Sequence, residues 1–147
     1  MRTVVMATVE VAVATELLER VRIWDLGAVM DYTGAKHPDW SDARLARAEQ
    51  GYREFLFLRG MYGGTEGVRL VPHVDVDEVW HSHLLHTEDY MHMCAEVLGA
   101  FMHHRPSPHG KPTERDRQDY NDTCKRLRHH FGDARDPRTW LGHAKAA

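Results

Sequence analysis

The chain has 147 residues, 42% of them hydrophobic and 28% charged, which is the usual size and composition of one soluble globular domain. Its formal net charge of −3 at pH 7 provides no general attraction to polyanions, so nucleic acid is not expected as a partner. The apolar N-terminal stretch is interrupted by Glu10, and no apolar run reaches the length of a membrane helix, so we expect a soluble, cytoplasmic protein without membrane contacts.

Apolar residues recur at intervals of three and four along much of the chain, which is the spacing of amphipathic helices. The pattern predicts a first helix near residues 12–30 and a second over 43–58, preceded by Ser41 as its N-terminal cap. Four glycines within residues 60–67 then interrupt regular structure, and residues 68–72 are predicted to be at most a short extended connector.

A long third helix is predicted from residue 76 to about residue 101. Asp75 followed by Glu78 fits a capping box at its start. The apolar side chains of this segment form one continuous face when they are placed at about 100° per residue. We therefore expect this helix to be the central element of the fold.

Prolines within residues 106–112 indicate a loop, and a last helix is predicted over 113–131. The predicted fold is all-α, a compact bundle of about four helices that forms a single domain over residues 1–147. Cys94 and Cys124 form no CxxC pair and are expected to be reduced thiols.

Histidines concentrate in one part of the chain, because eight of the twelve lie between residues 73 and 109. Asp77 and His81 are spaced i, i+4 on one edge of the predicted third helix, so both side chains can reach one point, as paired metal ligands must. One carboxylate and two imidazoles are the ligand set of non-haem iron oxygenases and of some hydrolytic zinc sites. The pattern predicts a Fe, Cu or Zn site of Asp77, His81 and His104, with His103 as an alternate ligand.

His83 follows His81 by two residues and points in a different direction on a regular helix, so one ion cannot bind both. Two assignments stay open. Either His81 faces the site and His83 is a buried partner of Thr87, Tyr90 or another helix, or His83 faces a buried site and His81 orients it.

Convergence of these residues sets a condition on the third helix. A straight helix would place His104 about 34 Å beyond His81, at 1.5 Å per residue. The helix must therefore end or break before His103, and we expect the break around Gly99. Otherwise the third ligand comes from another element.

Three functions are consistent with these residues. The first is a metal-dependent oxidoreductase or hydrolase that acts on a small molecule or peptide, including oxidative tailoring in biosynthesis. The second is a metal-free acid–base enzyme, a cyclase or isomerase, in which His81 or His83 is held by Asp77. The third is a non-catalytic helical binding module for a partner protein, in which the histidines are structural. The sequence specifies neither the substrate, nor the metal, nor the oligomeric state.

The stretch V-D-E-V-W-H-S-H-L-L at residues 76–85, followed by G-A-F-M-H-H-R-P at residues 99–106, resembles the glycine-rich-domain-containing-protein-like family. The resemblance extends over roughly residues 45–140. It implies a compact helical unit with a functional Asp/His cluster, and it implies no reaction that all members share.

Overall fold

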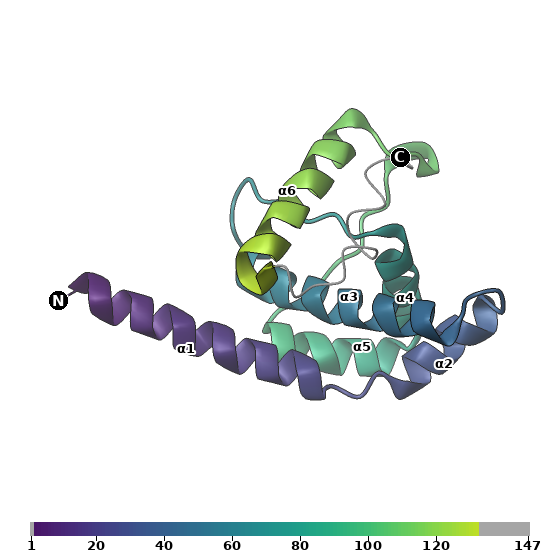
Figure 1. The fold of residues 1–147 in the computed structure, drawn as a ribbon, viewed down its shortest axis with the longest axis horizontal. Helices are drawn as coiled ribbons and strands as arrows, with labels where there is room; N and C mark the ends of the chain where they lie inside the picture. Colours follow the sequence, from purple (N-terminus) through teal and green to yellow (C-terminus); the bar gives the residue numbers. More distant parts are fainter. Residues whose placement is uncertain (1, 133–147) are drawn as a thin grey trace.

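The computed structural model describes residues 2–132, and these residues form an all-α fold of six helices without strands (Figure 1). The helices are α1 (Arg2–Ile23), α2 (Gly27–Lys36), α3 (Asp42–Tyr62), α4 (Val74–Leu85), α5 (Thr87–Met93) and α6 (Glu114–Phe131), with a π-helical turn η1 (Cys94–Leu98) and a 3-10 turn η2 (Pro108–Gly110). The predicted all-α class is confirmed, whereas the predicted count of about four helices is too low. None of these helices is both long and apolar enough to cross a membrane.

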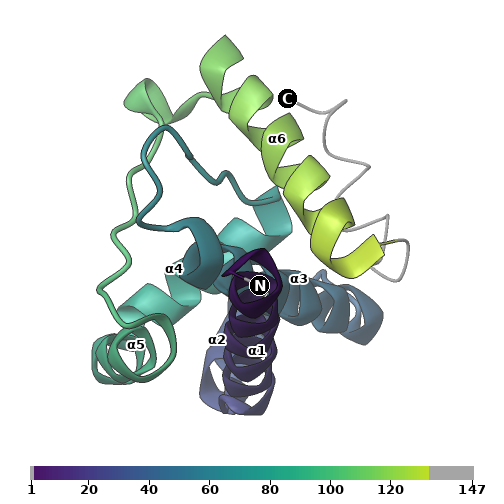
Figure 2. The same ribbon diagram turned by 90° about the vertical axis from the view of Figure 1, so that its left-hand side faces the viewer.

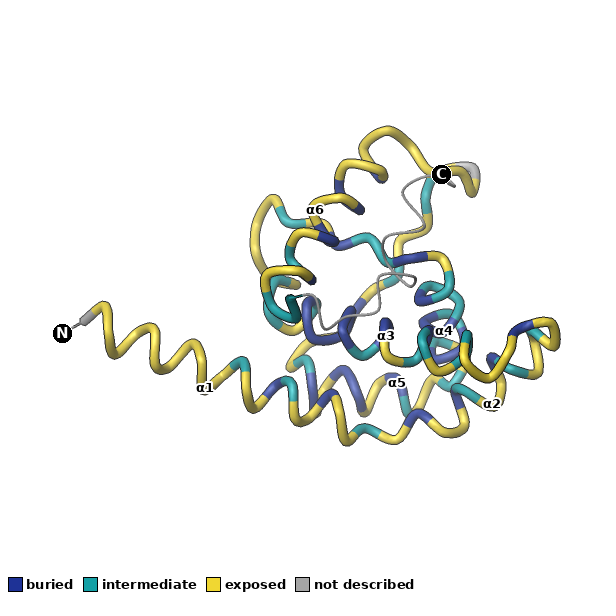
Figure 3. The backbone as a smooth tube through the Cα atoms, viewed as in Figure 1, coloured by how far each residue is buried: buried dark blue, intermediate teal, exposed yellow. Residues whose placement is uncertain are grey.

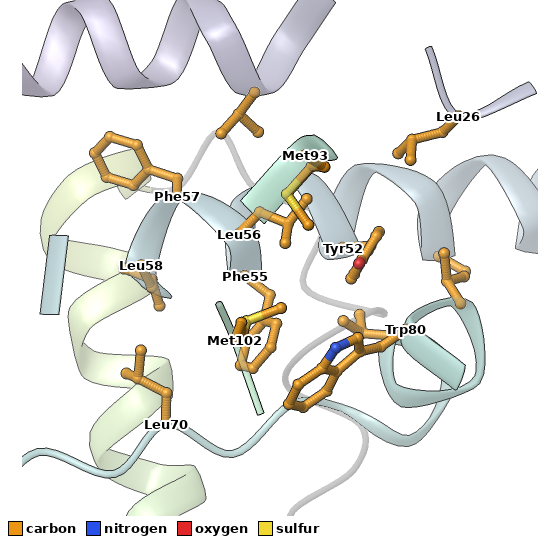
Figure 4. Packing of buried hydrophobic residues seen from close by; sticks show 14 of the residues in the cluster. Leu26, Tyr52, Phe55, Leu56, Phe57, Leu58, Leu70, Trp80, Met93 and Met102 are labelled. Carbon is orange, nitrogen blue, oxygen red and sulfur yellow. The ribbon is translucent and has the colours of Figure 1, made fainter. Parts of the chain in front are cut away.

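The centre of the fold is α3, which contacts α1, α2, α4, η1 and α6. Residues 54–58 of α3 are all buried, as in a helix that is covered on every side. Ser41 caps α3 as predicted, because its hydroxyl accepts a hydrogen bond from the Arg44 N–H. Figure 4 shows side chains of the core that α3 shares with its neighbours, including Leu26, Tyr52, Phe55, Leu56, Trp80, Met93 and Met102.

The predicted long central helix over residues 76–101 is wrong, because this segment is divided into α4, α5 and η1. The division falls at His86, whose backbone leaves the helical conformation (φ −87°, ψ 66°). The His86 N–H bonds to the carbonyl of His83, and its ring Nδ1–H donates to the carbonyl of Ser82 at 2.7 Å. These two bonds satisfy carbonyls that a continuous helix would use, so the helix can end there at low cost.

The start of α4 also differs from the prediction. His73 is the N-terminal cap, and its ring Nδ1 accepts a hydrogen bond from the Asp75 N–H at 3.0 Å. Asp75 and Glu78 do not form the expected capping box. Asp75 instead pairs with Arg44 of α3 at 2.9 Å, and Glu78 pairs with His37, directly after α2, at 2.8 Å. The acidic first turns of α4 therefore hold it against α2 and α3.

The single helix expected over residues 12–30 is two helices, α1 and α2. Asp25 explains the interruption, because its carboxylate accepts a hydrogen bond from the Gly27 N–H, a local bond that competes with the helical pattern. The first half of α1 extends away from the body of the protein with its side chains exposed, whereas Leu17 and Val21 pack into the core (Figures 1 and 3).

The last helix, α6, begins and ends where the sequence predicts. Thr113 caps it in a reciprocal capping box with Asp116. Figure 2 shows α6 and α5 on different sides of α3. Burial of Leu127 and Tyr120 attaches α6 to the core.

Candidate metal site

Asp77, His81 and His104 come together beside α4. The two imidazole Nε2 atoms are 2.9 Å apart, Asp77 Oδ1 is 3.0 Å from His104 Nε2, and Asp77 Oδ2 is 3.4 Å from His81 Nε2. Metal bonds of about 2.0–2.2 Å place two ligands about 3.0 Å apart at a right angle and about 3.4 Å apart at a tetrahedral angle. The three separations, which involve both oxygens of Asp77, are close to these values, so a small rearrangement is enough for one ion to bind the two nitrogens and one carboxylate oxygen.

The position of the cluster on α4 explains its partial exposure. Asp77 and His81 lie one turn apart at the edge of the face that buries Val76, Val79 and Trp80. Their side chains are 30% and 39% exposed. The His104 side chain is 15% exposed, and its ring packs against the Trp80 ring at 4.3 Å between centroids. The cluster thus has a protein wall on one side and solvent on the other.

His104 reaches α4 because the chain reverses after η1. Gly99 ends η1 in the left-handed conformation (φ +74°), which glycine adopts without the steric cost that other residues meet. The break predicted near Gly99 is therefore present, and the break at His86 adds to it. Together they replace the straight helix that would have carried His104 away from His81.

The backbone of Met102, two residues before His104, is held from both sides. The Tyr90 hydroxyl donates a hydrogen bond to the Met102 carbonyl and accepts one from the Trp80 Nε1–H at 3.0 Å. The Met102 N–H donates to Cys94 Sγ at 3.5 Å. Burial raises the pKa of both the Tyr90 hydroxyl and the Cys94 thiol, so both groups stay protonated at neutral pH.

Protons alone satisfy the cluster poorly. His104 Nε2 lies within hydrogen-bond distance of both Asp77 Oδ1 and His81 Nε2, yet an imidazole nitrogen carries only one hydrogen. The single N–H of one ring can therefore complete only one of these two contacts well. In the other contact, the two atoms face each other without a suitably placed hydrogen. A cation between the three atoms interacts favourably with every lone pair at once.

His83 lies in a different environment from His81. Its side chain is fully buried, and both ring nitrogens are engaged. Nε2–H donates to Asp89 at 2.7 Å, which leaves Nδ1 to accept from the Tyr52 hydroxyl at 2.7 Å. Asp89 also accepts a bond from the Trp24 Nε1–H at 3.2 Å. Burial lowers the pKa of His83, and Asp89 opposes this shift.

The remaining sequence candidate, His103, is exposed and contacts Phe101 rather than the cluster. A surface hollow lined by His86, Thr87, Glu88 and Asp89 lies at the junction of α4 and α5. Its lining includes none of the three clustered residues. Of the sequence candidates, the structure therefore joins only Asp77, His81 and His104.

Two further residues next to the cluster, Glu78 and His37, were not predicted to belong to the site. Glu78 Oε1 lies 3.9 Å from His81 Nδ1, on the side of the ring opposite the cluster, and Glu78 Oε2 bonds to His37. His37 is stacked on Trp40. A sequence signal for Glu78 does exist. Residues 77–81 have the spacing of the metalloprotease motif H-E-x-x-H, with Asp77 in place of the first His and Glu78 at the position of the motif's Glu.

The fold and the cluster define an all-α protein with two imidazoles and one carboxylate at a surface site. A family model described as UCP032817-like matches residues 24–132, so the chain belongs to the UCP032817-like family. Comparison with curated proteins and with solved structures found no match.

The family match corrects the resemblance drawn from the sequence, because the family is not the glycine-rich-domain-containing-protein-like family. The motif behind that resemblance mixes core residues such as Trp80 and His83 with cluster residues such as His104. The pattern thus combines the packing of α4 with the position of His104, and neither specifies a family. Residues 133–140 of the proposed match lie outside the described residues.

Proposed function

We propose that the protein binds one divalent transition metal, Fe, Cu or Zn, through Asp77, His81 and His104. In this proposal the protein is a mononuclear metal-dependent enzyme that acts on a small molecule or peptide. The observation that supports it is the convergence of one carboxylate and two imidazoles from two segments distant in sequence, with one ligand atom of each within 4.8 Å of the others.

Three protein ligands leave coordination positions for water or substrate, as in catalytic rather than structural metal sites. The exposed side of Asp77 and His81 gives a substrate access to those positions. A redox metal there supports oxidative tailoring, and zinc supports hydrolysis by lowering the pKa of a bound water to about 7. The chemistry thus follows from which metal is bound.

The same atoms support a second candidate function without a metal. His104 Nε2 lies 3.0 Å from Asp77 Oδ1, which is the carboxylate–imidazole contact of acid–base catalysts. In that case His81 and His104 exchange a proton with a substrate, as in a cyclase or isomerase. The crowding of two Nε2 atoms and a carboxylate oxygen in one place favours the metal site over this alternative.

The test is metal analysis of the protein purified without a histidine tag, followed by titration of the metal-free protein with Zn²⁺, Co²⁺ and, under anaerobic conditions, Fe²⁺. We expect about one equivalent bound by the wild type and by His103→Ala, the matched control. His81→Ala and His104→Ala should each lose binding by at least about 100-fold, more than the loss of an outer partner causes. Absence of binding in the wild type, or equal binding in all four proteins, would exclude the metal site.

A further inference from the structure

The geometry points to Tyr90 as a positioning residue for the proposed metal site: its hydroxyl fixes the backbone from which His104 reaches Asp77 and His81. The inference rests on the proposed function for its affinity readout, and a second readout tests it without metal.

The Tyr90 hydroxyl joins three parts of the chain. Tyr90 lies in α5 and is buried, its hydroxyl accepts a hydrogen bond from Trp80 of α4, and it donates one to the carbonyl of Met102. Trp80 in turn packs against the His104 ring. One hydroxyl therefore sets the distance between α4, which carries two of the clustered side chains, and the segment that carries the third.

The His104 ring and the Phe101 ring have contacts of their own, and the Ser107 hydroxyl bonds to Asp116 at 3.0 Å at the far end of the segment. Restraints on the backbone between them are few. Residues 101–107 have no regular secondary structure, and within residues 2–132 no backbone–backbone hydrogen bond reaches residues 101–106. The Met102 N–H bonds to a thiol sulfur, which is a weak acceptor. Burial of the Met102 side chain anchors the segment without fixing its direction. The bond from Tyr90 supplies that direction.

Tyr90→Phe isolates this role, because it keeps the ring that packs against His83 and Phe101 and removes only the hydroxyl. Outer partners that orient ligands typically change metal affinity by roughly 10–100-fold. Tyr52→Phe is the matched control. Tyr52 is also fully buried, and its hydroxyl also bonds to a side chain of α4, but that side chain is His83 rather than a neighbour of His104.

The experiment measures the Kd for Co²⁺ of full-length, metal-free wild type, Tyr90→Phe and Tyr52→Phe by absorbance titration against a competing chelator, with folding checked by circular dichroism. We expect Tyr90→Phe to raise Kd at least about tenfold and Tyr52→Phe to change it less than about threefold. A Kd for Tyr90→Phe within about threefold of wild type, or equal increases in both variants, would overturn the inference. If Tyr90→Phe does not fold, the backbone order of residues 100–105 in Trp80→Phe is compared with wild type by ¹⁵N relaxation, because this variant keeps the bond from Tyr90 to Met102 and removes the indole that packs against His104. Unchanged order supports Tyr90 as the restraint, and lower order assigns the restraint to the indole and overturns the inference.

Backbone ¹⁵N relaxation separates failure of this inference from failure of the proposed function. If the wild type binds no Co²⁺, the metal proposal fails, and the order parameters of residues 100–105 in the metal-free proteins decide the role of Tyr90. Lower order parameters in Tyr90→Phe than in both wild type and Tyr52→Phe support positioning. Equal order parameters in all three contradict it.

Discussion

His81 and His83 are two residues apart on α4 and occupy opposite kinds of environment. His83 is fully buried, and each of its ring nitrogens has one well-defined partner, Tyr52 or Asp89. His81 is partly exposed, and its Nε2 faces a second imidazole and a carboxylate. The first arrangement completes the hydrogen bonds of the protein, whereas the second leaves lone pairs directed at a common point.

The difference has a structural cause. Helical geometry turns consecutive odd positions to different sides, so α4 presents one histidine to the core and the other to the edge. The buried network ties α4 to α3 and to Asp89 of α5, across the break at His86. That break helps the chain to return with His104. The buried His83 therefore supports the geometry around His81, which we propose as a metal ligand.

The largest expected effect on stability comes from Trp80. Its indole connects the buried surroundings of His83 with the cluster, because it bonds to Tyr90 and contacts His104. Trp80→Ala should lower the free energy of unfolding by about 3–5 kcal/mol, as large-to-small aromatic changes in cores do. Urea denaturation followed by circular dichroism measures it. A loss below about 1 kcal/mol would instead place Trp80 at an open pocket.

The next largest effect is expected from His83, and substitution of His81 is its direct comparison. His83→Ala leaves the buried Tyr52 hydroxyl without its partner and should cost about 2–3 kcal/mol of stability. His81→Ala should change the stability of the metal-free protein by no more than about 0.5 kcal/mol, as for surface positions. Denaturation of both variants without metal gives the two values. Equal losses would contradict the division of roles.

Glu78 tests whether His81 is also held by a partner. Its carboxylate lies 3.9 Å from His81 Nδ1 and bonds to His37. Glu78→Gln should weaken Co²⁺ binding about tenfold, because a carboxylate behind a ligating imidazole orients it and raises its basicity. Competition titration measures the change. An unchanged Kd would mean that Glu78 only attaches α4 to α2.

The smallest predicted effect is a pH dependence from His83. Its pKa is lowered in the folded protein, mainly by burial, so the unfolded chain binds the proton more readily. Its contribution to stability is present above about pH 6.5 and is lost as the pH falls through the lowered pKa of the folded state, with a slope of at most about 1.4 kcal/mol per pH unit. Denaturation at several pH values, for wild type and His83→Gln, should show a shallower decline in the variant. Parallel curves would assign the pH dependence to other groups, such as His130.

Helices with strong local signals could be predicted from the sequence. Ser41 and Thr113 mark the starts of α3 and α6, and the all-α class follows from the periodicity. The division of residues 76–101 could not be predicted, because the apolar pattern continues through His86 and the bonds that end the helix are made by a histidine rather than by Gly or Pro. The centre of the fold was misjudged for the same reason.

For the cluster, the sequence identified the spacing of Asp77 and His81 and the condition that the helix must break before His103. The sequence analysis preferred His104 to His103 as the third ligand, but no local pattern accounts for that order. Which of two adjacent imidazoles faces α4 depends on the backbone after Gly99 and on the bond from Tyr90 to Met102. Such contacts between distant residues leave no local pattern.

X-ray absorption at the metal edge, on full-length protein loaded with one equivalent of Co²⁺ or Zn²⁺, tests the central proposal most directly. The proposed site predicts a nitrogen and oxygen shell at about 2.0–2.2 Å, with scattering from two imidazole rings, of which one is lost in His104→Ala. A spectrum without imidazole scattering, with sulfur ligands, or unchanged in His104→Ala would contradict the site formed by Asp77, His81 and His104.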